Sequence, residues 1–216
     1  MLACVAIGHV GRVLRKALIV AGLSMIMRDS SMKVVGIVGS PRIGGNTEIL
    51  TRIALEEIRK EGVRTELITL AGKKIAPCDA CRSCVKTGKC HFKDDFDPIY
   101  AKVKKADGVI LATPVYYGAA TPQIAAVISR FYKMRGKPLK HKVGGPIVVA
   151  RRAGKNFTLA QLMFFFMIHE MIVPGSTYWN VAIGRNKGEV EKDEEGVDTI
   201  RNFAHNIAWL AKKISK

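Results

Sequence analysis

Four cysteines lie within one short stretch of the chain, and their spacing could support metal chemistry. Two residues separate each of the first three, five precede the last, and the four are Cys78, Cys81, Cys84 and Cys90. Three evenly spaced cysteines followed closely by another are typical of iron–sulfur ligation, in which a tight turn surrounds a cubane cluster. The one other cysteine of the sequence is Cys4, far upstream. We therefore expect all four thiolates to bind one cluster.

Zinc and disulfides are the alternatives for this cysteine-rich loop. Structural zinc sites usually pair two C-x-x-C units that a dozen or more residues separate, and the spacing here fits that arrangement poorly. Disulfide frameworks belong to small secreted proteins, whereas this chain has 216 residues. Thiols that bind nothing are the remaining alternative. The spacing therefore favours iron–sulfur chemistry and leaves zinc as its main competitor.

A second stretch, from Gly39 to Thr47, could hold a phosphate group. It follows an apolar run at residues 33–38 and is rich in glycine, hydroxyl and amide side chains. Such a loop turns backbone N–H groups and a helix N-terminus toward an anion, and Arg42 adds a charge-assisted hydrogen bond. The loop matches neither the P-loop nor G-x-G-x-x-G. The alternative is an ordinary strand-to-helix turn that Asn46 or Thr47 caps.

The elements that must position these two loops alternate between strands and helices. We expect strands over residues 33–38, 63–70, 107–113, 145–151 and 172–181. Helices are expected over residues 48–61, 94–105, 123–135, 157–171 and 197–215, with a charged loop at 187–195. This alternation predicts an α/β fold, a doubly wound five-stranded parallel sheet with the cysteine-rich loop inserted after strand 2.

Parallel strands bring the loops that follow them to one edge of the sheet. In open α/β sheets ligands bind at the carboxyl ends of the strands. We therefore expect the cysteine-rich loop and the phosphate loop to share this edge, within one subunit or between neighbouring subunits. The helix at 157–171 is apolar nearly all round, including residues 164–166, which predicts burial in the core or at a subunit interface.

Composition indicates a globular protein with acidic partners. Hydrophobic residues make up 48% of the chain and the formal net charge is +17. Six bases and one acid, Asp79, lie between residues 73 and 93. These bases could balance the charge of a cluster or bind an acidic electron carrier. The loop lacks the interleaved aromatic residues of a nucleic-acid-binding surface, so we expect no nucleic-acid partner.

Residues 1–31 differ from the rest of the chain. Basic residues there precede an apolar run at 17–27 that is too short to span a bilayer and has no signal-peptide cleavage motif after it. We expect an N-terminal extension at residues 1–31, with translation starting at Met32 or Met27, and a single domain over residues 32–216. We expect a cytoplasmic protein without a membrane partner.

These residues resemble a known family. The loop at 39–47 resembles the FMN-phosphate loop of the flavodoxin-like NADPH-dependent FMN reductase superfamily. Residues 113–118, with Arg130 closing the following helix, resemble its second flavin loop. The C-x2-C-x2-C-x5-C insert is the mark of the iron–sulfur flavoprotein branch. The resemblance covers residues 32–216 and implies a flavodoxin-like fold, FMN and a [4Fe–4S] cluster as cofactors, and a homodimer or homotetramer with flavin sites at subunit contacts.

The resemblance also implies roles for individual residues. The FMN phosphate would bind to Ser40, Arg42, Asn46 and Thr47. The isoalloxazine ring would lie against Pro114, Val115, Tyr116, Tyr117 and Gly118. The loop with Arg152 and Gly154 would reach the pyrimidine end of the ring. We expect no catalytic nucleophile or general base, because the protein supplies position and potential to its cofactors.

The leading hypothesis is an oxidoreductase that uses FMN and a [4Fe–4S] cluster. It would transfer electrons between a carrier, such as an acidic ferredoxin, and an acceptor. The alternative is an NAD(P)H-dependent FMN or quinone reductase without a functional cluster. A third hypothesis, of another class, is a basic nucleic-acid-binding module with a zinc knuckle.

Overall fold

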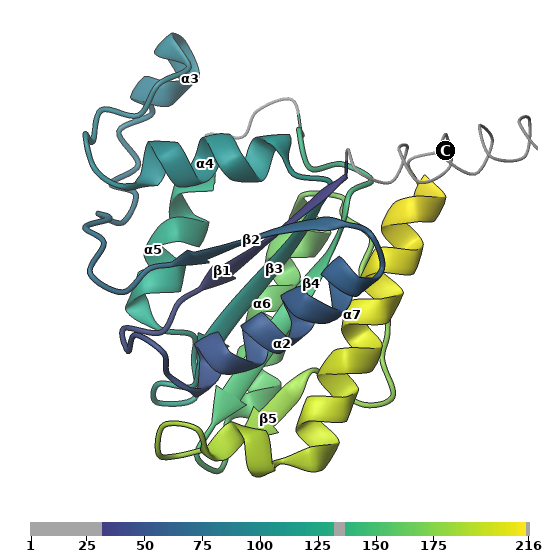
Figure 1. Ribbon diagram of the computed structural model, residues 1–216. Coiled ribbons are helices and arrows are strands. Elements are labelled where there is room, and N and C mark those ends of the chain that lie inside the picture. Colours follow the sequence, from purple (N-terminus) through teal and green to yellow (C-terminus); the bar gives the residue numbers. More distant parts are fainter. Residues whose placement is uncertain (1–31, 132–136, 215–216) are drawn as a thin grey trace, which may run out of the picture.

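Five parallel strands form the centre of the computed structural model, which describes residues 32–131 and 137–214 (Figure 1). The strands are β1 (Lys33–Val38), β2 (Arg64–Thr69), β3 (Gly108–Pro114), β4 (Val143–Ala150) and β5 (Val181–Ile183). Their order in the sheet is β2-β1-β3-β4-β5, and every pair is parallel. This is the strand order of flavodoxin-like folds, and it confirms the fold predicted from the sequence.

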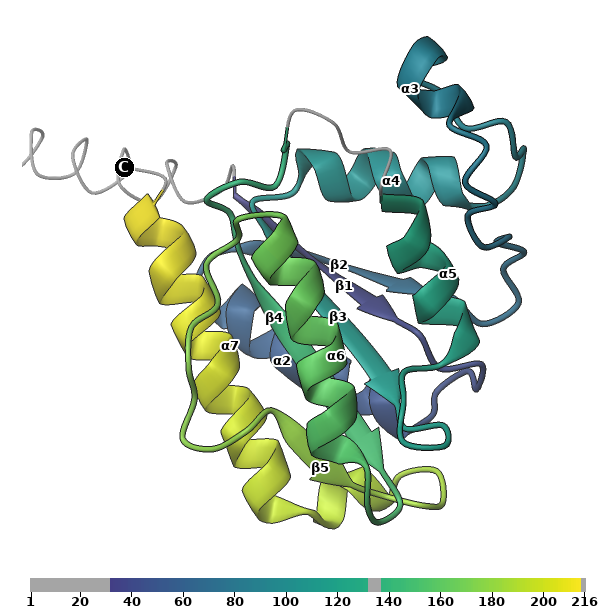
Figure 2. The same cartoon turned by 180° about the vertical axis from the view of Figure 1, so that it is seen from behind.

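Helices cover both faces of the sheet. On one face lie α2 (Asn46–Lys60) and α7 (Glu194–Ile214). On the other lie α4 (Phe96–Lys105), α5 (Pro122–Arg130) and α6 (Lys155–Ile168), as Figure 2 shows from behind. Two short helices, α3 (Ser83–Thr87) and the 3-10 helix η2 (Glu189–Lys192), lie in loops. The right-handed connections of parallel strands require this two-sided covering.

The alternation of side chains along β3 divides the core into two layers. Val109 and Leu111 are fully buried and face α4, α5 and α6. Ile110 and Ala112, equally buried, face α2 and α7. Successive residues of a strand point to opposite faces, so a strand that is buried on both faces must be apolar throughout. The sheet is thereby a rigid base for the loops at its carboxyl edge.

The predicted bounds of the last strand are wrong. We expected a strand over residues 172–181, but β5 is confined to Val181–Ile183, and Ile172 forms only an isolated bridge with Val143. Pro174 has no backbone N–H to donate, and Gly175 follows it, so the chain leaves the sheet here. The predicted charged loop at 187–195 contains η2 and the start of α7.

Some predictions fall outside the described residues. The N-terminal extension at 1–31, with Cys4, is among them, as is the end of the helix predicted over 123–135, which the structure describes only to Phe131. Within residues 32–131 and 137–214, none of the helices combines the length and the hydropathy that a membrane crossing needs.

Candidate functional site: two cavities at the ends of helix α5

The loop after β1 folds around its own backbone. Ser40 is buried, and its Oγ accepts a hydrogen bond from the backbone N–H of Arg42 at 3.1 Å. The Gly45 N–H donates to the Arg42 carbonyl at 3.3 Å, and Gly44 has a φ of 62°, a left-handed conformation that glycine adopts readily. The loop therefore turns tightly from β1 into α2.

Helix α2 begins at Asn46 without a side-chain cap, although Gly45 holds the N-cap position. The first N–H groups of a helix have no partner within the helix. Thr47 in this first turn is buried with 2% of its surface exposed. A phosphate at the positive end of the helix dipole can accept hydrogen bonds from such N–H groups.

The side chain of Glu48 stabilises the same loop. Its carboxylate accepts a hydrogen bond from the Gly44 N–H at 2.8 Å and forms an ion pair with Arg52 at 2.6 Å. Burial alone would raise the pKa of Glu48, but these hydrogen bonds and the charge of Arg52 outweigh it, so the pKa lies below its ordinary value. The carboxylate is therefore ionised and already paired with Arg52.

The loop after β3 forms a tight hairpin turn. Tyr116 and Ala119 exchange backbone hydrogen bonds at 2.9 and 3.0 Å. Between them Tyr117 and Gly118 have φ values of 50° and 78°, as a type I′ turn requires. Tyr117 is fully exposed at the tip. The turn therefore directs Tyr116, rather than Tyr117, toward the phosphate loop.

A single hydroxyl group holds the two loops together. Thr121 Oγ1 donates to the Gly39 carbonyl at 2.7 Å and accepts from the Ile124 N–H, which caps α5. A side chain at Gly39 would place its Cβ 2.7 Å from Ile124 Cβ, so only glycine allows this approach. The close contact fixes the distance between the phosphate loop and the start of α5.

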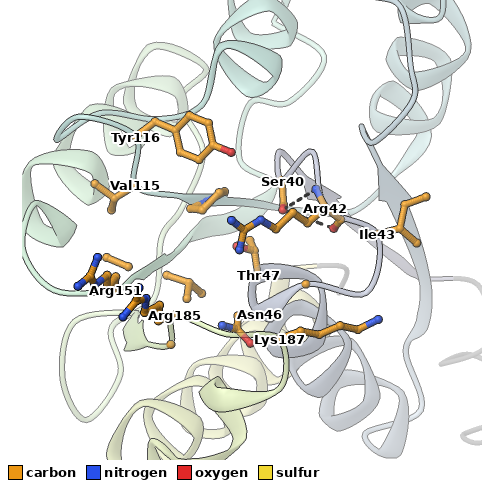
Figure 3. Close-up of a pocket in the computed structure, with 15 residues that line it drawn as sticks. Ser40, Arg42, Ile43, Asn46, Thr47, Val115, Tyr116, Arg151, Arg185 and Lys187 are labelled. Atoms are coloured by element: carbon orange, nitrogen blue, oxygen red, sulfur yellow. Dashed lines mark hydrogen bonds between the residues drawn. The ribbon is translucent and has the colours of Figure 1, made fainter.

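These loops enclose a cavity of ≈ 320 Å³, here called the phosphate cavity (Figure 3). Seven of the residues predicted to bind a flavin line it, namely Ser40, Arg42, Asn46, Thr47, Pro114, Val115 and Tyr116. The other four predicted residues, Tyr117, Gly118, Arg152 and Gly154, do not line it. Gly154 instead packs under the hairpin turn, where a Cβ would lie 2.9 Å from Val115 and 3.1 Å from Gly118.

The side chain of Asn46 binds protein atoms. Its Oδ1 accepts from the Gly188 N–H at 2.8 Å, and its Nδ2 donates to the Asn186 carbonyl at 2.7 Å. These two bonds attach residues 184–188, the loop after β5, to the start of α2. One hydrogen of the Asn46 amide remains for a ligand.

The stems of the cysteine-rich loop are joined by hydrogen bonds. Lys74 and Asp95 form two, from the Lys74 N–H to Asp95 Oδ2 at 2.8 Å and from the Asp95 N–H to the Lys74 carbonyl at 3.1 Å. The Cys78 N–H donates to Ser129 Oγ of α5 at 3.1 Å. Ala80 and Arg82 are left-handed, with φ values of 58° and 60°. The loop thus curls back on itself, with α3 projecting beyond α4 and α5 (Figures 1 and 2).

All four cysteines line one cavity of ≈ 420 Å³, here called the cysteine cavity. The four are free thiols; Cys78 and Cys81 are exposed, and Cys84 and Cys90 are half-buried. Phe92, Ser129 and Arg130 also line it, together with residues 79, 80 and 82 of the loop. The structure therefore brings together the four residues predicted as metal ligands.

The spacing of the thiols bears on which centre they fit. Zinc–thiolate bonds of 2.3 Å in a tetrahedron hold the sulfur atoms roughly 3.8 Å apart. Among the described residues, the one trio of potential ligand atoms within 4.8 Å is Asp79, Cys81 and His91, so no three of the cysteine sulfurs are that close. In this arrangement the cysteine sulfurs do not converge at the spacing of a zinc tetrahedron.

The two cavities lie at opposite ends of helix α5. Thr121 caps its N-terminus beside the phosphate loop, whereas Ser129 and Arg130 at its C-terminus line the cysteine cavity. The prediction that the two loops share one edge of the sheet is therefore wrong for a single chain. The cysteine-rich loop is long enough to leave the edge and follow α5 to its far end. Arg130, which closes the helix after the second flavin loop, lies at the cysteines.

Comparison with known proteins identifies the family of this chain. The profile of the NADPH-dependent FMN reductase family matches residues 32–186. An iron-sulfur flavoprotein of Methanocaldococcus jannaschii is 42% identical over 193 residues, which cover 86% of this chain and 100% of that protein. An iron-sulfur flavoprotein of Methanosarcina thermophila is 35% identical over 189 residues, 86% of this chain and 98% of that one. This chain belongs to the iron–sulfur flavoprotein family.

Solved structures of low identity confirm the fold of this family member. RosB, solved with 8-demethyl-8-formylriboflavin-5'-phosphate, superposes with a TM-score of 0.70 at 19% identity, over 85% of this chain and 80% of that one. A WrbA-like flavodoxin of Agrobacterium tumefaciens gives 0.63 at 18% identity, over 85% and 99%. Membership of the family makes the chain a flavoprotein oxidoreductase.

Sequence reasoning missed three basic residues of this iron–sulfur flavoprotein. Arg151, Arg185 and Lys187 line the phosphate cavity together with Arg42, and Figure 3 shows Arg151 and Arg185 on the same side of it. Arg185 and Lys187 follow β5 directly. The rule that ligands bind after the carboxyl ends of strands would have found both, had the last strand been placed at 181–183.

The hydrogen bonds of Asn46 lead to a stability prediction. We expect Asn46→Ala to lower the free energy of unfolding by about 1–3 kcal/mol, because it leaves a backbone N–H and a carbonyl without partners. Urea unfolding measures this loss, and hydrogen exchange at the Gly188 amide locates it. Asn186→Ala is the control, since it keeps the carbonyl that Asn46 binds and removes only the side-chain bond from Asn186 to Glu189. Unchanged exchange at Gly188 in Asn46→Ala would contradict the account.

Proposed function

We propose that this iron–sulfur flavoprotein binds FMN in the phosphate cavity and a [4Fe–4S] cluster in the cysteine cavity. It would pass electrons between a small carrier protein and an acceptor. The observation that carries the proposal is that four free thiols line one cavity. A second cavity of the same chain lies at the N-terminus of a helix that no side chain caps. A flavin exchanges electrons singly or in pairs and a cluster exchanges them singly, so the two together couple one-electron and two-electron reactions.

The chain's own residues fit the parts of FMN. Ser40, Arg42 and the first N–H groups of α2 would hold the phosphate. Pro114, Val115 and Tyr116 present an apolar and aromatic wall to the ring. The cations Arg151, Arg185 and Lys187 make the cavity strongly positive, and no ion pair of theirs occurs within the described part of the chain. An anionic ligand is therefore the one this cavity favours.

The partner we propose is an acidic electron carrier such as a ferredoxin. Six bases lie in the cysteine-rich loop and its stems, all of them exposed and none ion-paired within residues 32–131 and 137–214, and Arg82 among them lines the cysteine cavity. They are Lys73, Lys74, Arg82, Lys86, Lys89 and Lys93. The single acid of this stretch, Asp79, is paired with His91 at 2.8 Å. Free thiols that ligate a cluster require a reducing compartment, which supports a cytoplasmic location.

We also propose that the protein assembles as a homodimer or homotetramer through α6. One face of this helix buries Phe165 and Phe166 in the core. The opposite face exposes large apolar side chains, Phe157 (80% exposed), Phe164 (66%), Met167 (64%) and Ile168 (74%). An exposed apolar surface of this kind marks a protein–protein interface. The N-terminal end of this face adjoins the phosphate cavity through Gly154 and Val115.

A pair of substitutions separates a four-cysteine cluster from a zinc site. We expect Cys84→Ala to lose iron while keeping FMN, because the thiolates and the flavin occupy separate cavities. His91→Ala should keep its iron, since His91 is not a ligand of the cluster. A zinc site on Asp79, Cys81 and His91 predicts the reverse pattern. Metal content per flavin, measured on anaerobically purified protein, distinguishes the two sites. Flavin without any metal would favour the NAD(P)H-dependent reductase that lacks a cluster.

The role of Arg42 is tested by comparing two flavins. Arg42→Ala should weaken FMN binding by about 1.5–3 kcal/mol, the size of a hydrogen bond to a charged group. Riboflavin has no phosphate, so it should bind the variant and the wild type equally. Fluorescence titration of the apoprotein measures both affinities. Equal weakening of the two flavins would show that Arg42 does not contact the phosphate.

Association with an acidic carrier should depend on salt. Reduction by an acidic ferredoxin should slow as ionic strength rises, whereas reduction by a small neutral reductant should not. Reversal of Lys86 and Lys89 to glutamate should flatten this dependence in stopped-flow measurements. Reversal of Lys192 and Lys213, exposed bases outside the cysteine-rich loop, is the control. A salt-independent rate in the wild type would refute the docking surface.

The α6 interface predicts the oligomeric state. Phe164→Glu should convert the oligomer to a monomer, because a charge in the centre of an apolar interface must be desolvated without a partner. Light scattering coupled to size-exclusion chromatography measures the mass. Trp209→Glu on α7, which alters a side chain that is 54% exposed away from α6, is the matched control and should leave the mass unchanged. A monomeric wild type would overturn the proposal.

A further inference from the structure

Arg130 is a buried charge at the cysteine cavity. It is the last residue of α5 and retains 3% of its surface exposed. Its guanidinium lies over the rings of Phe92 and Phe96, 5.0 and 4.6 Å from the two centroids. Together with all four cysteines it lines the cavity. Aromatic rings on one side and thiols on the other leave this cation little access to water, so its field is weakly screened.

The hydrogen bonds of Arg130 hold the stem of the cysteine-rich loop. Nη1 donates to the Ala76 carbonyl at 2.9 Å and to Asp94 Oδ2 at 2.8 Å, and Nη2 donates to Asp94 Oδ1 at 3.3 Å. Asp94 also accepts from the Ala76 and Phe96 N–H groups at 2.9 and 3.1 Å. Arg130 and Asp94 therefore join α5, α4 and the start of the loop that carries Cys78.

The guanidinium keeps donor capacity for a ligand in the cavity. Arginine has five N–H donors, and Nε is buried without a hydrogen-bond partner among the described residues. Cys90 and the other three cysteines line the same cavity as Arg130. A buried donor without an acceptor, in a wall shared with four cysteines, is free to donate to a sulfur ligand in the cavity.

We propose that Arg130 is a positioning residue that holds the cysteine-rich loop and raises the reduction potential of the cluster, with Asp94 as the opposing charge. The inference rests on the proposed function. Reduction adds negative charge to the cluster, and a buried cation or a hydrogen bond to sulfur stabilises the reduced form. Removing the cation should therefore lower the potential, and removing the carboxylate should raise it.

The opposite signs of these two shifts separate tuning from structural support. Arg130→Gln removes the positive charge and keeps a polar side chain, whereas Asp94→Asn removes the negative charge and keeps one of the two acceptor oxygens. Loss of structural support would disturb the site in the same way in both variants. Arg130→Lys retains the positive charge but lacks the planar set of N–H donors that a guanidinium presents. Arg82→Gln removes a charge from an exposed residue that lines the same cavity and is the matched control.

The experiment is a potentiometric titration of the cluster, followed by electron paramagnetic resonance, on protein with measured iron and FMN content. We expect a midpoint potential below the wild type in Arg130→Gln, above it in Asp94→Asn and nearer to it in Arg130→Lys. Arg82→Gln should shift it less than Arg130→Gln, because water screens the exposed charge.

Shifts of one sign in Arg130→Gln and Asp94→Asn, or no shift in iron-replete Arg130→Gln, would overturn the proposal. If Arg130→Gln loses its iron, Asp94→Asn decides, and an unchanged potential there refutes the tuning role. Absence of iron from the wild type would instead refute the proposed function, so the two failures are distinguishable.

Discussion

The fixed length of helix α5 is the constraint on which the arrangement of both sites depends. Its nine residues span roughly 13 Å at 1.5 Å per residue. The Thr121 hydroxyl attaches one end to the phosphate loop, and the ion pair of Arg130 with Asp94 attaches the other end to the cysteine-rich loop. Because both ends are fastened, a change in the packing of α5 would move both sites together.

This separation defines the routes by which electrons could pass between the two cavities. Within one chain they must cover the length of α5. Between two chains the route depends on the contact at α6, whose exposed apolar face begins beside the phosphate cavity. The two proposals, the oligomer and the two-centre redox function, are therefore linked: the assembly determines which cluster lies nearest to a given flavin.

The sequence was sufficient for the fold class, for the first four strands and for the site residues that are adjacent in the chain. Strands buried on both faces must be apolar, so β1, β3 and β4 could be recognised, and the spacing of the four cysteines was readable because one loop carries them all. The last strand was misplaced, since the apolar run at 172–173 reads as a strand although Pro174 ends its pairing. Arg185 and Lys187 were missed for the same reason.

The position of Arg130 could not be predicted from local pattern. Its role depends on Asp94, which lies 36 residues earlier in the chain, and on the path of the cysteine-rich loop along α5. The prediction that the two loops share one edge of the sheet failed for the same reason. Topology determines where a loop leaves the sheet, whereas the hydrogen bonds of its stems determine the path that the loop then takes. The Cys78 N–H donates to Ser129 of α5, and no pattern of neighbouring residues in the sequence predicts this hydrogen bond.

The central claim is that one chain holds a flavin and an iron–sulfur cluster in separate cavities. The most direct test is the cofactor content of anaerobically purified wild-type protein, with iron, sulfide, zinc and FMN measured together with the visible spectrum. We expect about four iron atoms per FMN and flavin bands superposed on a broad cluster absorption. Flavin accompanied by zinc, or by no metal, would contradict it.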